Sequence, residues 1–121
     1  MNDVDSAFLL PTRVMDFTAA RARALQTNLG NASVPGYQRV DVDFAALVKA
    51  VRSEREGALA TTSPAIEVDQ HATAGVTGNT VEFEREQVQI DKNALLHELA
   101  TFFLNGKLNT LRSAIRGSAT S

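Results

Sequence analysis

Residues 4–32 read VDSAFLLPTRVMDFTAARARALQTNLGNA. Selected positions in this stretch alternate steps of four and three residues, which places them along one side of a helix. These positions are Val4, Phe8, Pro11, Met15, Thr18, Ala22, Leu25, Leu29 and Ala32. All but Thr18 are apolar, and the spacing is that of a helix packed along another helix, as in a coiled coil. The stretch therefore predicts an N-terminal helical region over 4–32.

Proline and glycine set the expected limits of this helix. Pro11 has no backbone N–H and disfavours helix just before it, so we expect regular helix from Pro11 or Thr12 and a looser turn before it. At the other end, the sequence Val34-Pro35-Gly36 is a turn signal that ends the helix near Ala32. We expect Gly36 to need a positive φ more than Gly57 or Gly75 does.

The middle of the chain, 33–79, differs in composition from both ends. We predict a short helix over about 42–52, capped by Asp41 or Asp43. Its apolar face is formed by Phe44, Leu47, Val48 and Val51. The remainder, 53–79, is rich in Gly, Ser and Thr and is expected to be a flexible loop, with Ile66 and Val68 as one possible short strand.

The C-terminal region, 80–117, is expected to be helical again and to end at Gly117. It carries two apolar stripes: Val88, Leu95, Leu99 and Phe102, and then Leu104, Leu108, Leu111 and Ile115. A helix that is apolar on two sides needs two neighbours. The N-terminal helix can be one of them, and we expect the other to be a second protein chain.

Composition excludes several classes of function. The chain has 121 residues, a formal net charge of −2 and no Cys. The length favours a single domain over 1–121, and the absence of Cys excludes disulfide scaffolds and thiol catalysis. The charge gives no electrostatic reason to expect nucleic acid as a partner. The first ten residues lack the Lys or Arg of a cleaved secretory signal, and we find no transmembrane segment.

The sequence offers no active site. His71 and His97 have no Cys or His partner at metal-ligand spacing, so we expect a solvated loop residue and a partly packed helix residue. The acidic run Glu82, Glu84 and Glu86 is interpreted as a solvated face rather than as an acid–base pair. We therefore expect no enzyme activity, no cofactor, no metal and no small-molecule substrate.

Two blocks of sequence resemble a known family. Residues 28–39, NLGNASVPGYQR, closely resemble the N-terminal signature of bacterial flagellar axial proteins. Residues 78–117 resemble, more narrowly, the proteins of the proximal rod in the flagellar basal body. The similarity covers about 12–50 and 78–117 and leaves the middle loop unmatched. Gly30, Ser33, Val34, Gln38 and the run 96–98 depart from the family pattern.

The resemblance implies a mainly α fold, in which the long N- and C-terminal helices pack as a hairpin with little β structure. Such proteins form the inner layer of a helical tube around an export channel. They leave the cytoplasm through the flagellar type III apparatus without a cleaved signal, and the rod transmits motor torque across the periplasm. The implied partners are copies of the chain, other rod proteins, and membrane-ring and export-gate proteins at the rod base.

Specific residues follow from the resemblance and the stripes together. The expected signature turn consists of Asn28, Asn31, Pro35, Gly36 and Tyr37. The expected assembly interface consists of Met15, Ala22, Leu25, Leu29, Leu95, Leu99, Phe102, Leu104, Leu108, Leu111 and Ile115. The alternative hypothesis is a helical adaptor or an export-chaperone-like binding module, for which the amphipathic helices would also suffice. A small enzyme ranks last.

Overall fold

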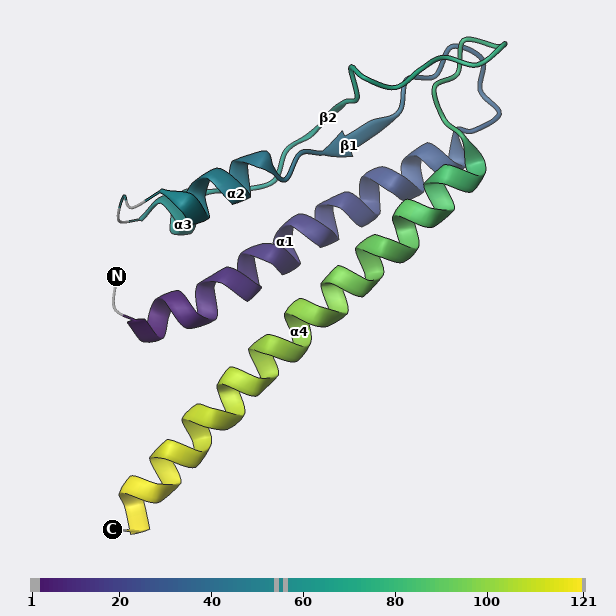
Figure 1. Cartoon of the computed structure of the whole chain (residues 1–121). Helices are drawn as coiled ribbons and strands as arrows, with labels where there is room; N and C mark the ends of the chain where they lie inside the picture. Colours follow the sequence, from purple (N-terminus) through teal and green to yellow (C-terminus); the bar gives the residue numbers. More distant parts are fainter. Residues whose placement is uncertain (1–2, 54, 56, 121) are drawn as a thin grey trace.

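The computed structural model of the chain describes residues 3–53, 55 and 57–120, and its fold is mainly α, as predicted. In chain order, its elements are α1 (Asp3–Gly30), β1 (Val40–Val42), α2 (Ala45–Arg52), α3 (Ala58–Thr61), β2 (Ile66–Val68) and α4 (Phe83–Thr120). The two long helices run antiparallel and meet at the end where the loops gather (Figure 1).

Helix α1 occupies the middle of three layers. On one side it contacts β1, α2 and α3, and on the other it contacts α4, which touches no other described helix or strand (Figure 1). The hydrophobic core lies between α1 and the first of these layers, where Phe17 and Ala20 pack against Val42 and Leu47. The ring of Phe17 also meets Phe44 edge to face at 5.5 Å.

The prediction for the start of α1 is wrong. The helix begins at Asp3 and carries Pro11 in its interior instead of in its first turn. A proline there removes one backbone donor and crowds the preceding turn. The hydroxyl of the next residue, Thr12, donates to the carbonyl of Phe8 at 2.8 Å, so the helix has a local side-chain bond where it is weakened. The side chain of Val4 lies outside the described residues, and α1 ends at Gly30 rather than near Ala32.

The middle segment contains more structure than the expected loop. Strand β2 does form, and β1 is its antiparallel partner, with Val40 opposite Val68 and Val42 opposite Ile66. Residues 58–61 add the one-turn helix α3. The sequence could not predict this pairing, because each strand has only three residues and the two strands lie far apart in the chain. Glu54 and Glu56, in the segment expected to be loop, lie outside the described residues.

Two helix boundaries also differ from the prediction. Helix α2 begins at Ala45 because 40–42 belong to β1, and Asp43 Oδ1 accepts a hydrogen bond from the Ala45 amide at 2.8 Å. Helix α4 begins at Phe83 and passes through Gly117 to Thr120. A single glycine costs a helix only about 1 kcal/mol, too little to end it without further signals. None of the described helices has the length and hydropathy needed to span a bilayer.

Candidate assembly surfaces

The predicted signature turn forms a clamp at the end of the helical hairpin. Asn28 is fully buried, and its side chain pairs with the backbone of Val40: Nδ2 donates to the carbonyl at 2.7 Å, and Oδ1 accepts from the amide at 2.8 Å. The hydroxyl of Tyr37 donates to the same Oδ1 at 3.1 Å. Asn28 therefore holds the start of β1 against the last turn of α1.

The turn also contacts the loop that precedes α4. Gly36 has φ 75°, as expected, and its amide donates to the carbonyl of Thr77 at 3.0 Å. Gly57 also has a positive φ, 82°, so the expectation that Gly36 would differ from it is wrong. Pro35 is exposed, and Asn31 donates through Nδ2 to the carbonyl of Thr27 at 2.7 Å.

Asn79 completes the clamp, and sequence reasoning missed it. Its Nδ2 lies within 2.6–3.1 Å of the carbonyl oxygens of Asn31, Ala32 and Val34, which follow the end of α1. Its Oδ1 accepts from the amide of Val81 at 2.7 Å. One buried amide thus satisfies groups on both sides of the junction between α1 and α4. The only sequence signal was an Asn next to Gly78, a common turn pair.

An ion network centred on Arg39 ties the layers together. Its guanidinium donates to Glu86 at 2.6 Å and to Asp69 at 2.6 Å, and it reaches Asp41 at 3.3 Å. Glu86 is only 2% exposed, so the interpretation of this residue as part of a solvated face is wrong. Period-2 spacing of the acidic run suggested an extended segment, but 83–86 are helical, and the helix turns Glu86 toward α1 and the network.

The charges in this network reinforce one another. Burial would lower the pKa of Arg39, but its hydrogen bonds to Glu86 and Asp69 outweigh burial and raise that pKa. Burial would likewise raise the pKa of Asp69, but bonds from the His71 amide and from Arg39 lower it. Burial, reinforced by the charge of Glu86, raises the pKa of Tyr37, which keeps its hydroxyl as a donor. Near neutral pH, Arg39 and Asp69 therefore stay charged and Tyr37 stays neutral.

The face of α4 that meets α1 is largely polar in its first half. Its inward positions include Glu86, Asn93 and His97. Thr18 Oγ1 lies 2.6 Å from His97 Nδ1, and Asn93 Nδ2 donates to the carbonyl of Thr18 at 2.9 Å. Thr18, the one polar residue in the predicted α1 stripe, is therefore the contact point for two polar residues of α4.

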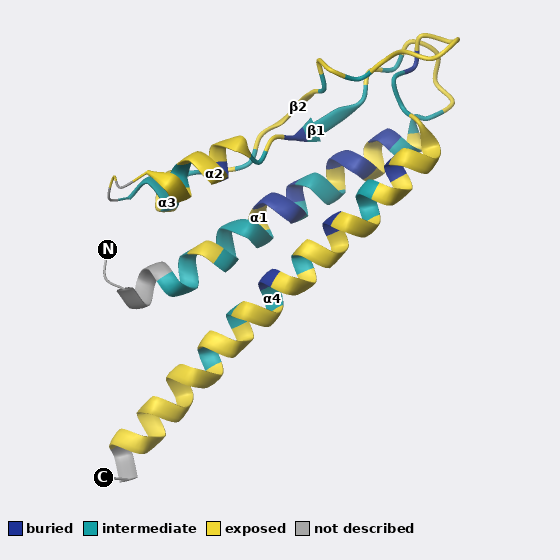
Figure 2. Cartoon of the chain, viewed as in Figure 1, coloured by how far each residue is buried: buried dark blue, intermediate teal, exposed yellow. Residues whose placement is uncertain are grey.

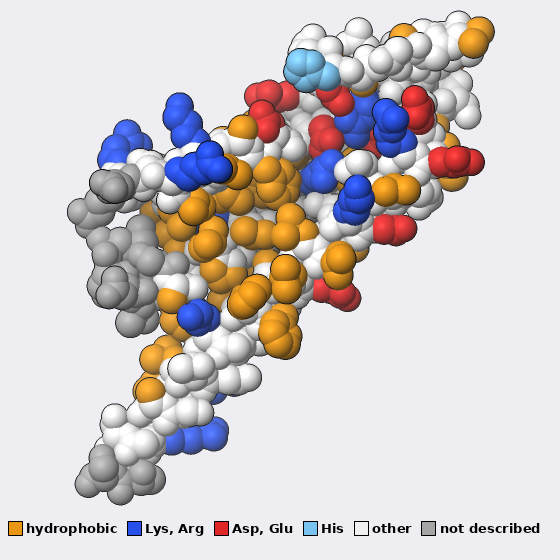
Figure 3. Space-filling model, in the orientation of Figure 1, with side chains coloured by type: hydrophobic (Ala, Val, Ile, Leu, Met, Phe, Trp, Pro, Cys, Tyr) orange, Lys and Arg blue, Asp and Glu red, His pale blue; other side chains and the backbone are white. Residues whose placement is uncertain are grey.

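One apolar side of α4 remains largely exposed. We call Val88, Leu95, Leu99 and Phe102 the outer stripe. Leu95 is 66% exposed, Leu99 49% and Phe102 72%. Figure 2 shows this helix exposed along most of its length, and Figure 3 shows hydrophobic side chains gathered over α1, α2 and the middle of α4. Exposed apolar patches are typical of surfaces that contact other proteins.

A second apolar row continues past the end of the hairpin. We call Leu104, Leu108, Leu111 and Ile115 the tail stripe. It lies on the same side of α4 as the inward positions, but α4 has 38 residues and α1 has 28, so the last turns of α4 extend beyond α1 (Figure 1). Leu104 and Leu108 are half-buried, whereas Leu111 and Ile115 are exposed.

The α1 residues of the predicted interface are less accessible. Leu25 is fully buried within the chain, on the same face as Thr18, and takes part in its own fold. Met15, Ala22 and Leu29 are half-buried. Of the residues in the predicted interface, those that are exposed therefore lie on α4.

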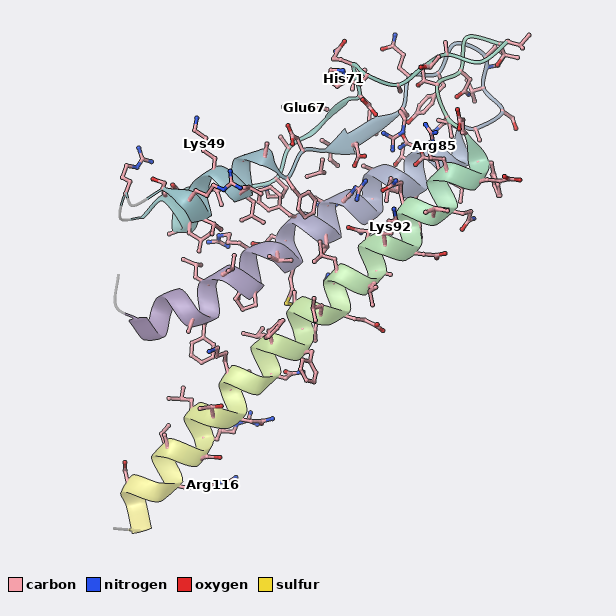
Figure 4. The ribbon with its side chains drawn as sticks, in the orientation of Figure 1. Lys49, Glu67, His71, Arg85, Lys92 and Arg116 are labelled. Atoms are coloured by element: carbon pink, nitrogen blue, oxygen red, sulfur yellow. The ribbon has the colours of Figure 1, made fainter. Side chains whose placement is uncertain are left out.

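The described residues hold no group of three or more His, Asp or Glu side chains able to bind a metal ion. His71 is exposed in the loop after β2, close to Glu67 in the view of Figure 4.

Comparison with known proteins shows which family the chain belongs to. No protein-family model matches the sequence. A flagellar basal body rod protein FlgB from Aquifex aeolicus is 31% identical over 88% of this chain and 90% of the relative. The protein of that name from Cereibacter sphaeroides is 31% identical over 80% of this chain and 84% of the relative. The chain belongs to the FlgB family of flagellar basal body rod proteins.

A FlgB protein from Salmonella typhimurium is 29% identical over 97% of this chain and 98% of the relative, so the likeness includes the middle segment. The resemblance found in 28–39 and 78–117 is confirmed. As a FlgB family member, the chain is a structural protein of the bacterial flagellum, and its place is the rod of the basal body. Membership implies assembly with other rod and basal body components.

Proposed function

We propose that the chain is a subunit of the proximal rod that assembles through its terminal helices into a helical tube. The tube surrounds the export channel and transmits motor torque across the periplasm. The observation that supports this most directly is the outer stripe, a row of large apolar side chains that are 49–72% exposed.

Burial of this row would supply the energy of assembly. Covering one Leu or Phe side chain contributes roughly 1.5–3 kcal/mol. The hairpin holds the row in a fixed geometry, because hydrogen bonds from Asn28 to Glu86 and from Asn93 to Thr18 join α1 and α4 directly. A torque-bearing subunit needs such fixed geometry, since a hinge between its helices would absorb the load.

The proposal also covers the binding partners of the chain and the route by which it reaches the rod. The partners are copies of the chain and other rod proteins, with membrane-ring and export-gate proteins at the rod base. The subunit reaches the rod through the flagellar type III export apparatus. The assembly interface comprises the outer stripe, the tail stripe and the partly buried α1 residues Met15, Ala22 and Leu29, while Leu25 supports them from within.

The test replaces Leu95 by Asp in the organism that carries the chain. Leu95 is exposed, so Leu95→Asp leaves the hairpin intact but puts a charge into the proposed contact. Cells should make and export the protein yet lack complete rods in electron micrographs and fail to swim. Gln87→Asp adds the same charge at another exposed position, about 80° round the helix, and should swim normally.

Normal basal bodies in Leu95→Asp cells would show that the outer stripe is not a rod contact. Purified basal bodies distinguish the adaptor alternative, because an adaptor or chaperone-like module would be absent from them, whereas a rod subunit remains.

A further inference from the structure

The strand β2 has one edge that is not paired with β1. The amide of Asp69 donates to the carbonyl of Arg39 at 3.0 Å, so these two residues form a hydrogen-bonded pair at the end of the ladder. Hydrogen-bonded and non-hydrogen-bonded pairs alternate along an antiparallel ladder. Val68 and, two residues before it, Ile66 therefore turn their backbone amides and carbonyls away from β1.

The opposite edge of this sheet is closed. On β1, the Asn28 side chain makes with the backbone of Val40 the two hydrogen bonds that a neighbouring strand would make. No residue that the structure describes does the same for Ile66 or Val68, which are 47% and 41% exposed. Figure 1 shows β2 on the outer side of β1, away from α1. The outer edge of β2 is thus open to a third strand.

A third strand would need a particular order of side chains. Ile66 and Val68 share one face of β2, so the residues placed opposite them should be apolar. Glu67 lies on the other face, is exposed, and takes part in none of the ion pairs between described residues. A Lys or Arg directly opposite Glu67 would supply that pair. The edge therefore fits an extended segment with the order apolar–basic–apolar.

A hollow beside Glu67 has room for the basic side chain. It has a volume of about 350 Å³, and its acidic lining residues are Asp41, Asp43, Glu67 and Asp69. Asp41 and Asp69 are already paired with Arg39. Asp43 and Glu67 have no cationic partner among the described residues, so a Lys or Arg in the hollow would reach two carboxylates. Figure 4 shows the side chain of Glu67 turned away from α1.

A second copy of the chain is a poor match for this edge. The β2 strand of another copy would bring a second Glu67 to the first, and like charges on paired strands are unfavourable. Apolar–basic–apolar triplets do occur in the sequence, such as 20–22 (ARA) and 48–50 (VKA), but they lie within α1 and α2 and are not extended. The edge is therefore suited to a different polypeptide.

We propose that an extended segment of another basal body protein, apolar–basic–apolar in sequence, adds to the edge of β2 as a third strand. Its backbone exchanges hydrogen bonds with Ile66 and Val68, and its central Lys or Arg lies in the hollow between Glu67 and Asp43. In such contacts the main-chain hydrogen bonds give affinity and the alternate side chains give specificity. The inference goes beyond the proposed function, because it concerns the middle segment and not the terminal helices.

The first test removes one outward hydrogen-bond donor. Val68→Pro deletes an amide that faces the third strand but none that faces β1, and proline is tolerated at such positions of an edge strand. The purified variant should keep its helix content and urea midpoint, while complete basal bodies fall about fivefold or more in number. Val68→Ala keeps the amide, is the matched control, and should retain most of them. Wild-type numbers of complete basal bodies in Val68→Pro cells would overturn the proposal.

The second test does not depend on how well the proline variant folds. The photo-reactive amino acid benzoylphenylalanine replaces Ile66, which is exposed and faces the third strand. Illuminated cells should link the chain to a protein of different sequence, and mass spectrometry should place the link in an apolar–basic–apolar segment. Adding Glu67→Lys should lower the yield of this link at least about twofold. Glu84→Lys, an exposed reversal in the first turn of α4, is the matched control and should leave the yield unchanged.

The outcomes separate this inference from the proposed function. A link to another copy of the chain, a link to a helix of the partner, or no link at all would each overturn strand addition. If Leu95→Asp blocks the rod while position 66 gives no link, the rod function stands and only this inference is wrong. If the unmodified chain is absent from purified basal bodies, the proposed function itself fails.

Discussion

Gly36 shows how one residue fixes the junction of the two long helices. Its φ of 75° lies in the left-handed region, and its amide donates to Thr77 across the junction. A Cβ at Gly78 would lie 3.5 Å from the Cα of Gly36, so the two turns pass close to each other. Glycine adopts this left-handed backbone at position 36 without the strain that a residue with a side chain would bring.

We expect Gly36→Val to destabilise the isolated subunit by about 1–2 kcal/mol or more, because a β-branched side chain is strongly disfavoured at positive φ. Urea unfolding followed by circular dichroism measures the change. Gly75→Val is the matched control, since Gly75 has no positive φ and a Cβ there would make an ordinary 3.5 Å contact with the carbonyl of Asn79. Equal midpoints for the two variants would contradict the account of the turn.

Arg39 adds ion pairs between elements that strand pairing and Asn28 also connect. Strand β1, the segment after β2 and the first turn of α4 contribute Asp41, Asp69 and Glu86 to its guanidinium. Asp41 also receives hydrogen bonds from Arg21 of α1 at 2.8 and 3.2 Å. The short strands alone bury little apolar area, so the ion network helps to hold them against the helices.

We expect Arg39→Ala to cost about 3–5 kcal/mol, because Glu86 would be left as a buried charge without its main partner. The free energy of unfolding from urea titration is the measurement. Arg85→Ala removes a pair with Glu82 whose side chains are 74% and 61% exposed, and its effect should stay within about 0.5 kcal/mol. A loss below about 1 kcal/mol for Arg39→Ala would mean that the network adds little to folding.

The molecule has two parts: a packed hairpin, and a C-terminal tail of α4 that packs against much less of the chain. From the loop end to about Leu104, α4 is braced by α1, and α1 by the layer of β1, α2 and α3 (Figure 1). Beyond Leu108, the side chains of α4 that the structure describes, up to Ser118, are exposed. Isolated helices of this length are marginal in water.

Amide hydrogen exchange on the dilute monomer should follow this division. We expect slow exchange over 17–28 and over 86–100, where side chains on both helices are buried, and rapid exchange over 108–118. In purified basal bodies, the same C-terminal amides should become protected, because neighbouring subunits cover the tail stripe. Strong protection of 108–118 in the monomer at low concentration would refute this division.

The local pattern of the sequence determined the long helices. Their 3.6-residue periodicity over 4–32 and 80–117, and the turn at Pro35 and Gly36, depend on residues that are near neighbours in the chain. The same locality explains why Gly36 was predicted to have positive φ. The signature in 28–39 also indicated the family, because a family motif can be read without knowing what its side chains touch.

Only the tertiary structure decided the roles of the polar residues. Asn79, Arg39 and Glu86 meet partners 40 or more residues away, and no periodicity encodes such contacts. Pairing of β1 with β2 and continuation of α1 before Pro11 likewise depended on long-range packing that outweighs local propensity. The apolar stripes could be found in the sequence, but the side of α4 that turns to α1 depended on those polar contacts. The outer stripe stayed exposed because Asn93 and His97 already occupy the contact with α1.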